Sequence, residues 1–204
     1  FGMDLSEAAC EENVGKLVQR AQQLGGFVRI DMESSPYTDR TLAIVTRLHQ
    51  LYGACGTVVQ AYLRRSAKDI ECLQRAKIRV RLCKGAYLEP PEVAFPDKKE
   101  VDNSYLELGK SLIEHGPYPG LATHDWRMIE PLERFAEQKG IPRDRFEFQM
   151  LYGIRRDEQK RLVREGYRLR VYVPFGEAWY PYFMRRLAER PANLLFFLKY
   201  MTGP

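Results

Sequence analysis

The sequence predicts an α/β protein of the (β/α)8 TIM-type barrel class. Two observations favour this class: short apolar or β-branched runs alternate with longer helix-like stretches, and nearly every run ends in polar residues. Barrel enzymes assemble their sites in this way, from the C-terminal ends of many strands. A doubly wound sheet that binds a dinucleotide would instead concentrate its signal in one GxGxxG turn, and the sequence contains none.

The strands are predicted from short runs rich in β-branched and aromatic residues. Six such runs occur, at Phe27 to Ile30, Thr57 to Tyr62, Ile78 to Leu82, Gly120 to Thr123, Phe146 to Leu151 and Leu169 to Val173. Helix signals lie between them. The clearest are amphipathic spacing from Ser6 to Leu24, Asp39 before Thr41 to Leu51, Ser66 before Ile70 to Leu73, and the stretch Arg155 to Glu165.

Length and composition fit one globular domain. The 204 residues are 45% hydrophobic and 29% charged, and no low-complexity linker divides them, so we expect a single catalytic barrel domain over residues 1–204. No apolar run approaches the roughly eighteen residues of a membrane span, and Phe1 to Cys10 lack the pattern of a signal peptide. A cytoplasmic protein is therefore predicted.

The charge does not indicate a nucleic-acid-binding protein. The formal net charge is +5, but basic and acidic residues are interleaved throughout. An anionic cofactor or a membrane surface fits this charge as well. The cysteines lack CxxC spacing, so free thiols are predicted and no metal site: Cys10, Cys55, Cys72 and Cys83.

Polar residues follow six successive predicted strands. A single polar residue at a strand end is more often a helix cap or a solvated loop group than a catalyst. Six in succession favour a shared site, because each buried polar group left unpaired costs about 1 to 3 kcal/mol. These residues are Asp31 and Glu33, Gln60, Arg81 with Lys84, Thr123 with His124, Gln149, and Tyr172.

The last predicted helix, Trp179 to Glu189, carries an arginine pair. Tyr182, Arg185 and Glu189 recur at three- and four-residue steps and so share one face, with Arg186 beside it. Adjacent guanidinium groups near aromatic rings suit a planar anion such as a carboxylate. A surface ladder of ion pairs is the alternative, because Arg185 and Glu189 are four residues apart; the helix alone leaves both interpretations open.

Seven segments together resemble the proline dehydrogenase family in order and spacing. They are IDME (30–33), VVQAYL (58–63), IRVRLCKGAY (78–87), ATHD (122–125), FEFQMLYG (146–153), RVYVPFG (170–176) and WYPYFMRRLAERPAN (179–193). The resemblance covers essentially the whole chain. It is closer to the short monofunctional bacterial branch than to the enzymes fused to an aldehyde dehydrogenase.

The resemblance implies a specific reaction. L-Proline would be oxidised to 1-pyrroline-5-carboxylate by hydride transfer from C5 to N5 of FAD, which is the first step of proline catabolism. The implied electron acceptor is a membrane quinone, which predicts transient contact with the inner face of the cell membrane. The implied downstream enzyme is pyrroline-5-carboxylate dehydrogenase.

The resemblance also assigns roles to residues. Asp31 matches an acid that orients the substrate end of the site, and Arg81 matches the arginine near flavin N5, where a donor stabilises developing negative charge. His124 matches a cofactor ligand and not a general base. The substrate-binding matches are Arg185 and Arg186 for the carboxylate and Tyr172, Tyr182, Leu151 and Tyr87 for the ring. The cofactor-binding matches are Met32, Gln60, Arg81, Lys84, Gly85, Ala86, Thr123, His124, Gln149 and Glu189.

A complete barrel has eight strands and the sequence shows about six. The resemblance implies that the other two precede residue 1. We therefore expect a barrel that lacks about two N-terminal strands. Two rival interpretations remain at this stage. A phosphate-binding barrel would be colourless and would use the arginine pair for a phosphoester, whereas a structural or regulatory remnant would bind no flavin and turn over no substrate.

Overall fold

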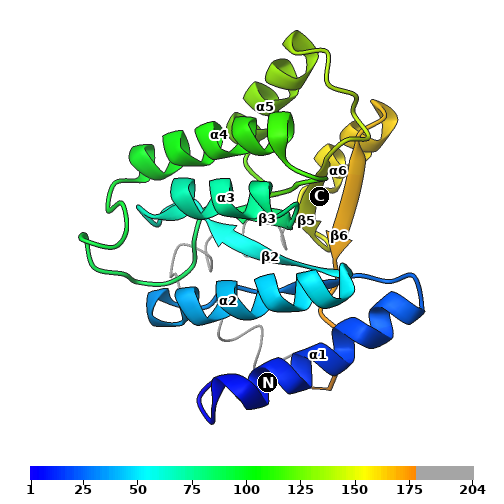
Figure 1. The fold of residues 1–204 in the computed structure, drawn as a ribbon. Helices are drawn as coiled ribbons and strands as arrows, with labels where there is room; N and C mark the ends of the chain where they lie inside the picture. Colours follow the sequence, from blue (N-terminus) through cyan, green and yellow to red (C-terminus); the bar gives the residue numbers. More distant parts are fainter. Residues whose placement is uncertain (178–204) are drawn as a thin grey trace.

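The computed structural model describes residues 1–177, which form six helices and six strands (Figure 1). In chain order they are α1 (Glu7–Gln23), β1 (Val28–Ile30), α2 (Ser35–Tyr52), β2 (Cys55–Gln60), α3 (Ser66–Arg75), β3 (Arg79–Cys83), α4 (Lys98–His115), β4 (Gly120–Ala122), α5 (Trp126–Gln138), β5 (Glu147–Leu151), α6 (Arg156–Arg164) and β6 (Arg168–Tyr172).

The strands form one parallel sheet in the order β1-β2-β3-β4-β5-β6. A doubly wound sheet would reverse its strand order at a switch point, and none of the described strands does so. Right-handed crossovers between successive neighbours place all the helices on the same face, and Figure 1 shows them around the outside of the curved sheet. The predicted class is confirmed: the described residues form six consecutive units of a TIM-type barrel.

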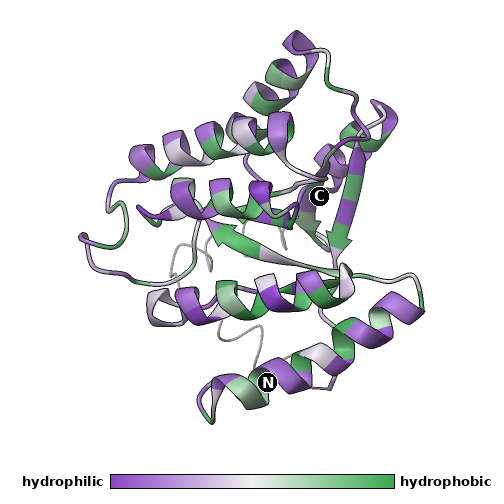
Figure 2. Ribbon diagram, in the orientation of Figure 1, coloured by the Kyte–Doolittle hydropathy of each residue, from purple (hydrophilic) through white to green (hydrophobic). Residues whose placement is uncertain are grey.

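Alternate residues of each strand face the helices or the concave side of the sheet. Val59, Leu82, Leu121 and Phe148 are register partners across four strands, and each is fully buried in the main core. The opposite face is polar. Figure 2 shows the resulting alternation of hydrophobic and hydrophilic residues along β6. The core thus lies between sheet and helices, and the concave face remains for polar groups and a site.

The predicted strands are confirmed to within two residues at each end. The helix from Ser6 is also confirmed, because the Ser6 hydroxyl accepts the Ala9 N–H as the N-cap of α1. The sequence did not delimit α4 and α5, which begin after Asp97 and Asp125, and each of these aspartates caps its helix with its own carboxylate.

The predicted start of the second helix was wrong. We expected Asp39 to precede a helix from Thr41, but α2 begins at Ser35, four residues before Asp39. The N–H and hydroxyl of Ser35 both donate to the Glu89 carboxylate, at 2.7 and 2.6 Å, and Asp39 instead pairs with Arg65. A side chain 54 positions away therefore supplies the cap.

Among the helices of residues 1–177, none combines the length and apolar character of a transmembrane segment.

Candidate active site

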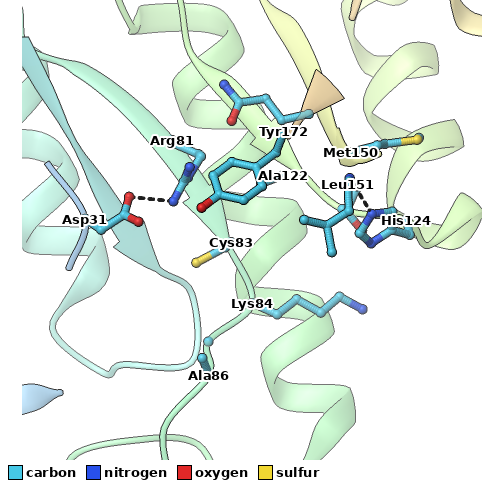
Figure 3. A pocket seen from close by; sticks show the side chains of 13 residues that line it. Asp31, Arg81, Cys83, Lys84, Ala86, Ala122, His124, Met150, Leu151 and Tyr172 are labelled. Atoms are coloured by element: carbon cyan, nitrogen blue, oxygen red, sulfur yellow. Dashed lines mark hydrogen bonds and ion pairs between the residues drawn. The ribbon is translucent and has the colours of Figure 1, made fainter. Parts of the chain in front are cut away.

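A cavity of about 260 Å³ lies at the carboxyl ends of the strands. Five of the six strands or the loops that follow them contribute to its lining, as a site in a barrel requires. Figure 3 shows the side chains converging from these elements. The lining residues are Asp31, Arg81, Cys83, Lys84, Gly85, Ala86, Ala122, Thr123, His124, Gln149, Met150, Leu151 and Tyr172.

The two residues predicted to be catalytic form an ion pair. Arg81 of β3 donates from Nη2 to Oδ1 of Asp31, just beyond β1, at 2.6 Å (Figure 3). The Asp31 side chain is 52% exposed and that of Arg81 only 19%, so the carboxylate faces the opening and the guanidinium lies deeper. A guanidinium held in this way can donate to a second acceptor in the cavity, because it has five N–H groups.

The wall formed by residues 83–86 depends on close backbone packing. Gly85 has φ +133°, and a Cβ at this position would lie 2.3 Å from the Tyr62 ring. The glycine is therefore required by the ring behind it as well as by its own backbone conformation. The adjacent Ala86 N–H donates to Oε1 of the buried Gln60 at 3.1 Å, which fixes this segment from below.

His124 is half-buried beside the cavity. Its Nε2 accepts the Leu151 N–H at 2.9 Å, so the ring proton is assigned to Nδ1. Burial, reinforced by nearby Arg155, lowers the pKa of His124 from 6.5 to about 4. The Nε2 lone pair accepts a backbone hydrogen bond, and the role of His124 as a cofactor ligand stays a prediction.

Lys84 joins the cavity wall to two helices. Its ammonium donates to Asp102 of α4 at 2.5 Å and to Asp125, the N-cap of α5, at 3.1 Å. Burial alone would raise the pKa of Asp125, but hydrogen bonds from Arg127 and Lys84 hold it well below its usual value. The pKa of Asp102 is also lowered, because hydrogen bonds from Lys84 and Lys98 outweigh its burial.

The deeper layer of the concave face is strongly charged. Glu147 is 4% exposed and accepts from both Nε and Nη2 of Arg170, at 2.6 and 2.9 Å, and from the Gln149 amide at 2.6 Å. Burial raises the pKa of Glu147, but these hydrogen bonds lower it below its ordinary value overall. Burial and then the charge of Arg81 lower the pKa of Arg29 to about 10.

Ten of the predicted site residues line the cavity, and three others in the described part of the chain do not. Met32 follows Asp31 directly and points into the hydrophobic core, where it is 5% exposed. Gln60 lies behind the wall, and the Tyr87 hydroxyl donates to the Glu33 carboxylate. The cofactor or substrate contacts assigned to Met32, Gln60 and Tyr87 therefore stay predictions.

Three lining residues were not predicted as site residues: Cys83, Ala122 and Met150. Cys83 and Ala122 follow by strand alternation from Arg81 and His124, so a period of two along β3 and β4 could have found them. Met150 carries no such signal, because it faces the core side of β5.

The predicted arginine pair and its neighbours lie outside the described residues. Tyr182, Arg185, Arg186 and Glu189 all fall within residues 178–204. Within residues 1–177 the structure contains no group of three or more His, Cys, Asp or Glu side chains placed to hold a metal ion.

The comparisons with known proteins cover nearly the whole chain. A family model described as "Proline dehydrogenase" matches residues 3–198. Proline dehydrogenase 2 of Bacillus subtilis is 46% identical over 202 residues, which cover 99% of this chain and 67% of the relative. Proline dehydrogenase of Deinococcus radiodurans is 47% identical over 191 residues, covering 93% of this chain and 62% of the relative.

A solved structure supports the same assignment. The crystal structure of proline utilization A from Bdellovibrio bacteriovorus, a protein inactivated by N-propargylglycine, superposes on this chain with a TM-score of 0.79 at 32% identity. The match covers 85% of this chain and 21% of that protein. This chain spans about two thirds of the length of the curated relatives that it matches. By sequence and by fold, the chain belongs to the proline dehydrogenase family.

Proposed function

We propose that this chain forms most of the catalytic barrel of an enzyme that oxidises L-proline to 1-pyrroline-5-carboxylate, with FAD as the hydride acceptor. The observation that carries the proposal is the convergence of the family segments: residues from five of them line one cavity at the carboxyl ends of the strands. A fold alone would not support an activity, because TIM-type barrels host many reactions.

The lining of the cavity supports the reactive ring of a flavin as the ligand. One side offers the Arg81 guanidinium as a donor and the closely packed backbone of Gly85 and Ala86, and the other offers the apolar side chain of Leu151 and the Tyr172 ring (Figure 3). Flat heteroaromatic rings bind between apolar walls with a few polar groups at their edges. When bound, FAD would supply the two-electron acceptor for proline C5.

The residues of this chain would then orient the flavin and stabilise the negative charge that develops on it. Arg81 would donate to the flavin edge where negative charge develops, and Asp31 would hold the guanidinium in place through the 2.6 Å ion pair. Lys84, Thr123, His124 and Gln149 would border the cofactor at the ends of β3, β4 and β5.

The proposed substrate-binding residues lie partly within residues 1–177 and partly beyond them. Tyr172 and Leu151 line the cavity and would pack against the proline ring. Arg185 and Arg186 would bind the carboxylate, Tyr182 and Tyr87 would complete the ring pocket, and Glu189 would contact the cofactor. Holding C5 about 3 to 3.5 Å from the acceptor and excluding water would be the main task of this arrangement.

Electron transfer to a membrane quinone is part of the proposal. It would bring an otherwise cytoplasmic enzyme to the inner face of the cell membrane, and the net charge of +5 would favour an anionic surface. The product would pass to pyrroline-5-carboxylate dehydrogenase.

The visible absorbance spectrum tests the cofactor. We expect a protein that carries this chain at the full length of its relatives to purify yellow, with oxidised-flavin bands and close to one FAD per chain. Replacing either Arg185 or Arg186 by Met should raise the KM for proline roughly ten- to hundredfold and leave FAD content unchanged. A colourless protein that binds phosphoesters would contradict the proposal, as would an unchanged KM in both variants.

A further inference from the structure

The Lys84 ion pairs connect three segments that meet at the cavity. Lys84 directly follows β3, Asp102 lies in the first half of α4, and Asp125 directly follows His124 at the start of α5. The side chains of the three residues are 23%, 18% and 19% exposed. Of the three, only Lys84 lines the cavity, so both carboxylates act from outside it.

Both carboxylates accept further hydrogen bonds. Asp125 accepts the Arg127 N–H as the N-cap of α5, and its own N–H donates to the Thr123 hydroxyl at 3.1 Å. Asp102 also accepts from Lys98, at 2.5 Å, through its second oxygen. An ammonium held between two carboxylates from different helices has little rotational freedom, because each charge-assisted hydrogen bond restricts it in a different direction.

The backbone next to Lys84 forms the cavity wall. The Lys84 carbonyl accepts the Tyr62 N–H at 2.9 Å, and Gly85 and Ala86 follow it along the lining. In Figure 3 the Lys84 side chain extends away from Arg81 and Asp31. The side chain is therefore directed to the helices, while its backbone continues into the site.

We propose that Asp102 and Asp125 are positioning residues for cofactor binding: by holding Lys84 they fix the Gly85–Ala86 wall relative to the loop of Thr123 and His124. The inference rests on the proposed function only in naming a flavin as the ligand. The geometry accounts for two carboxylates around one lysine. If the Lys84 ammonium bound the ligand directly, the two carboxylates would compete with the ligand for its hydrogen bonds. If Lys84 instead connects two loops, both carboxylates are needed.

A double-mutant cycle on FAD affinity tests the proposal. Asp102→Asn is the informative change, because Asp125 also caps α5 and its loss would disturb that helix. Asp102→Asn should weaken FAD binding roughly tenfold, as the loss of one charge-assisted hydrogen bond to a positioned group implies. In the Lys84→Met background the same change should add little, because both substitutions break one connection.

Lys98→Met provides the matched control. Lys98 contacts the other oxygen of Asp102, is 67% exposed and does not line the cavity, so FAD affinity should stay within about twofold of the parent. The visible circular dichroism of bound flavin should change in Asp102→Asn and not in Lys98→Met. Additive effects in the cycle, or unchanged FAD affinity in Asp102→Asn, would overturn the proposal.

Amide hydrogen exchange gives a second measurement that needs no flavin. Asp102→Asn should accelerate exchange at the Ala86 and Asp125 N–H groups, which donate to Gln60 and Thr123, and Lys98→Met should not. Unchanged exchange at both amides in Asp102→Asn would also overturn it. A parent protein without flavin would contradict the proposed function, while the exchange experiment would still decide this inference.

Discussion

Burial and hydrogen bonding together set the charge state of single residues in this site. His124 is held neutral by burial and by Arg155, whereas Glu147 is held ionised by the hydrogen bonds of Arg170 and Gln149 despite its burial. The two residues lie in different layers of the same concave face. The His124 imidazole near the opening and the Glu147 carboxylate below it therefore lead to two separate predictions about the free energy of unfolding.

The first prediction concerns pH. The unfolded chain protonates His124 below pH 6.5 but the folded chain only near 4, so in this window the unfolded state binds more protons and the free energy of unfolding falls as pH falls. Replacing His124 by Gln should remove roughly 1 to 3 kcal/mol of this loss between pH 6.5 and 4, measured by urea unfolding at each pH. The exposed His115→Gln is the control. An identical pH dependence in parent and His124→Gln would contradict the assignment.

The second prediction concerns the buried carboxylate. Glu147→Gln should lower the free energy of unfolding by about 1 to 3 kcal/mol, because it replaces a buried carboxylate that accepts from Arg170 and Gln149 with a neutral amide that is a weaker acceptor. Glu130→Gln makes the same change in an exposed pair with Arg134 and should cost less than about 0.5 kcal/mol. Equal losses in the two variants, measured by chemical denaturation, would show that Glu147 is no more important than a surface ion pair.

Helices and strands whose signals lie in their own residues were predicted from the sequence. The six strands followed from β-branched runs, and the helix at Ser6 followed from its own cap. The start of α2 was missed because its cap comes from Glu89, across the loop after β3. Long-range capping leaves no signal in neighbouring residues, so only the three-dimensional structure reveals it.

In the candidate site, too, features that depend on local sequence pattern were predicted and features that depend on long-range contacts were not. Polar residues at strand ends, such as Arg81 and His124, were predicted to converge and do so. Asp31 and Met32 were assigned together by resemblance, but neighbouring residues of an extended segment point to opposite faces, and Met32 lies in the core. The partners of Lys84 were not predicted, because Asp102 and Asp125 lie 18 and 41 positions away.

The third prediction tests the long-range cap. Glu89→Ala should lower the free energy of unfolding by about 0.5 to 2 kcal/mol, because the N-terminus of α2 loses both its hydrogen bonds and a favourable negative charge. Glu92→Ala, at an exposed position of the same loop, should be nearly neutral. Thermal or chemical unfolding of the two variants measures the difference, and a neutral Glu89→Ala would mean that the contact does not stabilise the helix.

At the scale of the whole molecule, the consecutive strand order decides what the fold can do. Neighbouring strands that follow one another in sequence bring their carboxyl ends to one rim, so residues as distant as Asp31 and Tyr172 line the same cavity. The helices and the main core occupy the opposite face of the sheet. The concave face is therefore available to form a ligand site without disturbing the core.

Anaerobic reduction of the bound flavin by L-proline is the decisive test of whether this protein oxidises proline with a flavin. In a protein that carries this chain at the full length of its relatives, adding L-proline without oxygen or quinone should bleach the oxidised-flavin absorbance, with 1-pyrroline-5-carboxylate formed in equal amount. Subsequent addition of a soluble quinone should restore the absorbance. A flavin spectrum that L-proline leaves unchanged, or a protein that binds no flavin, would contradict the account.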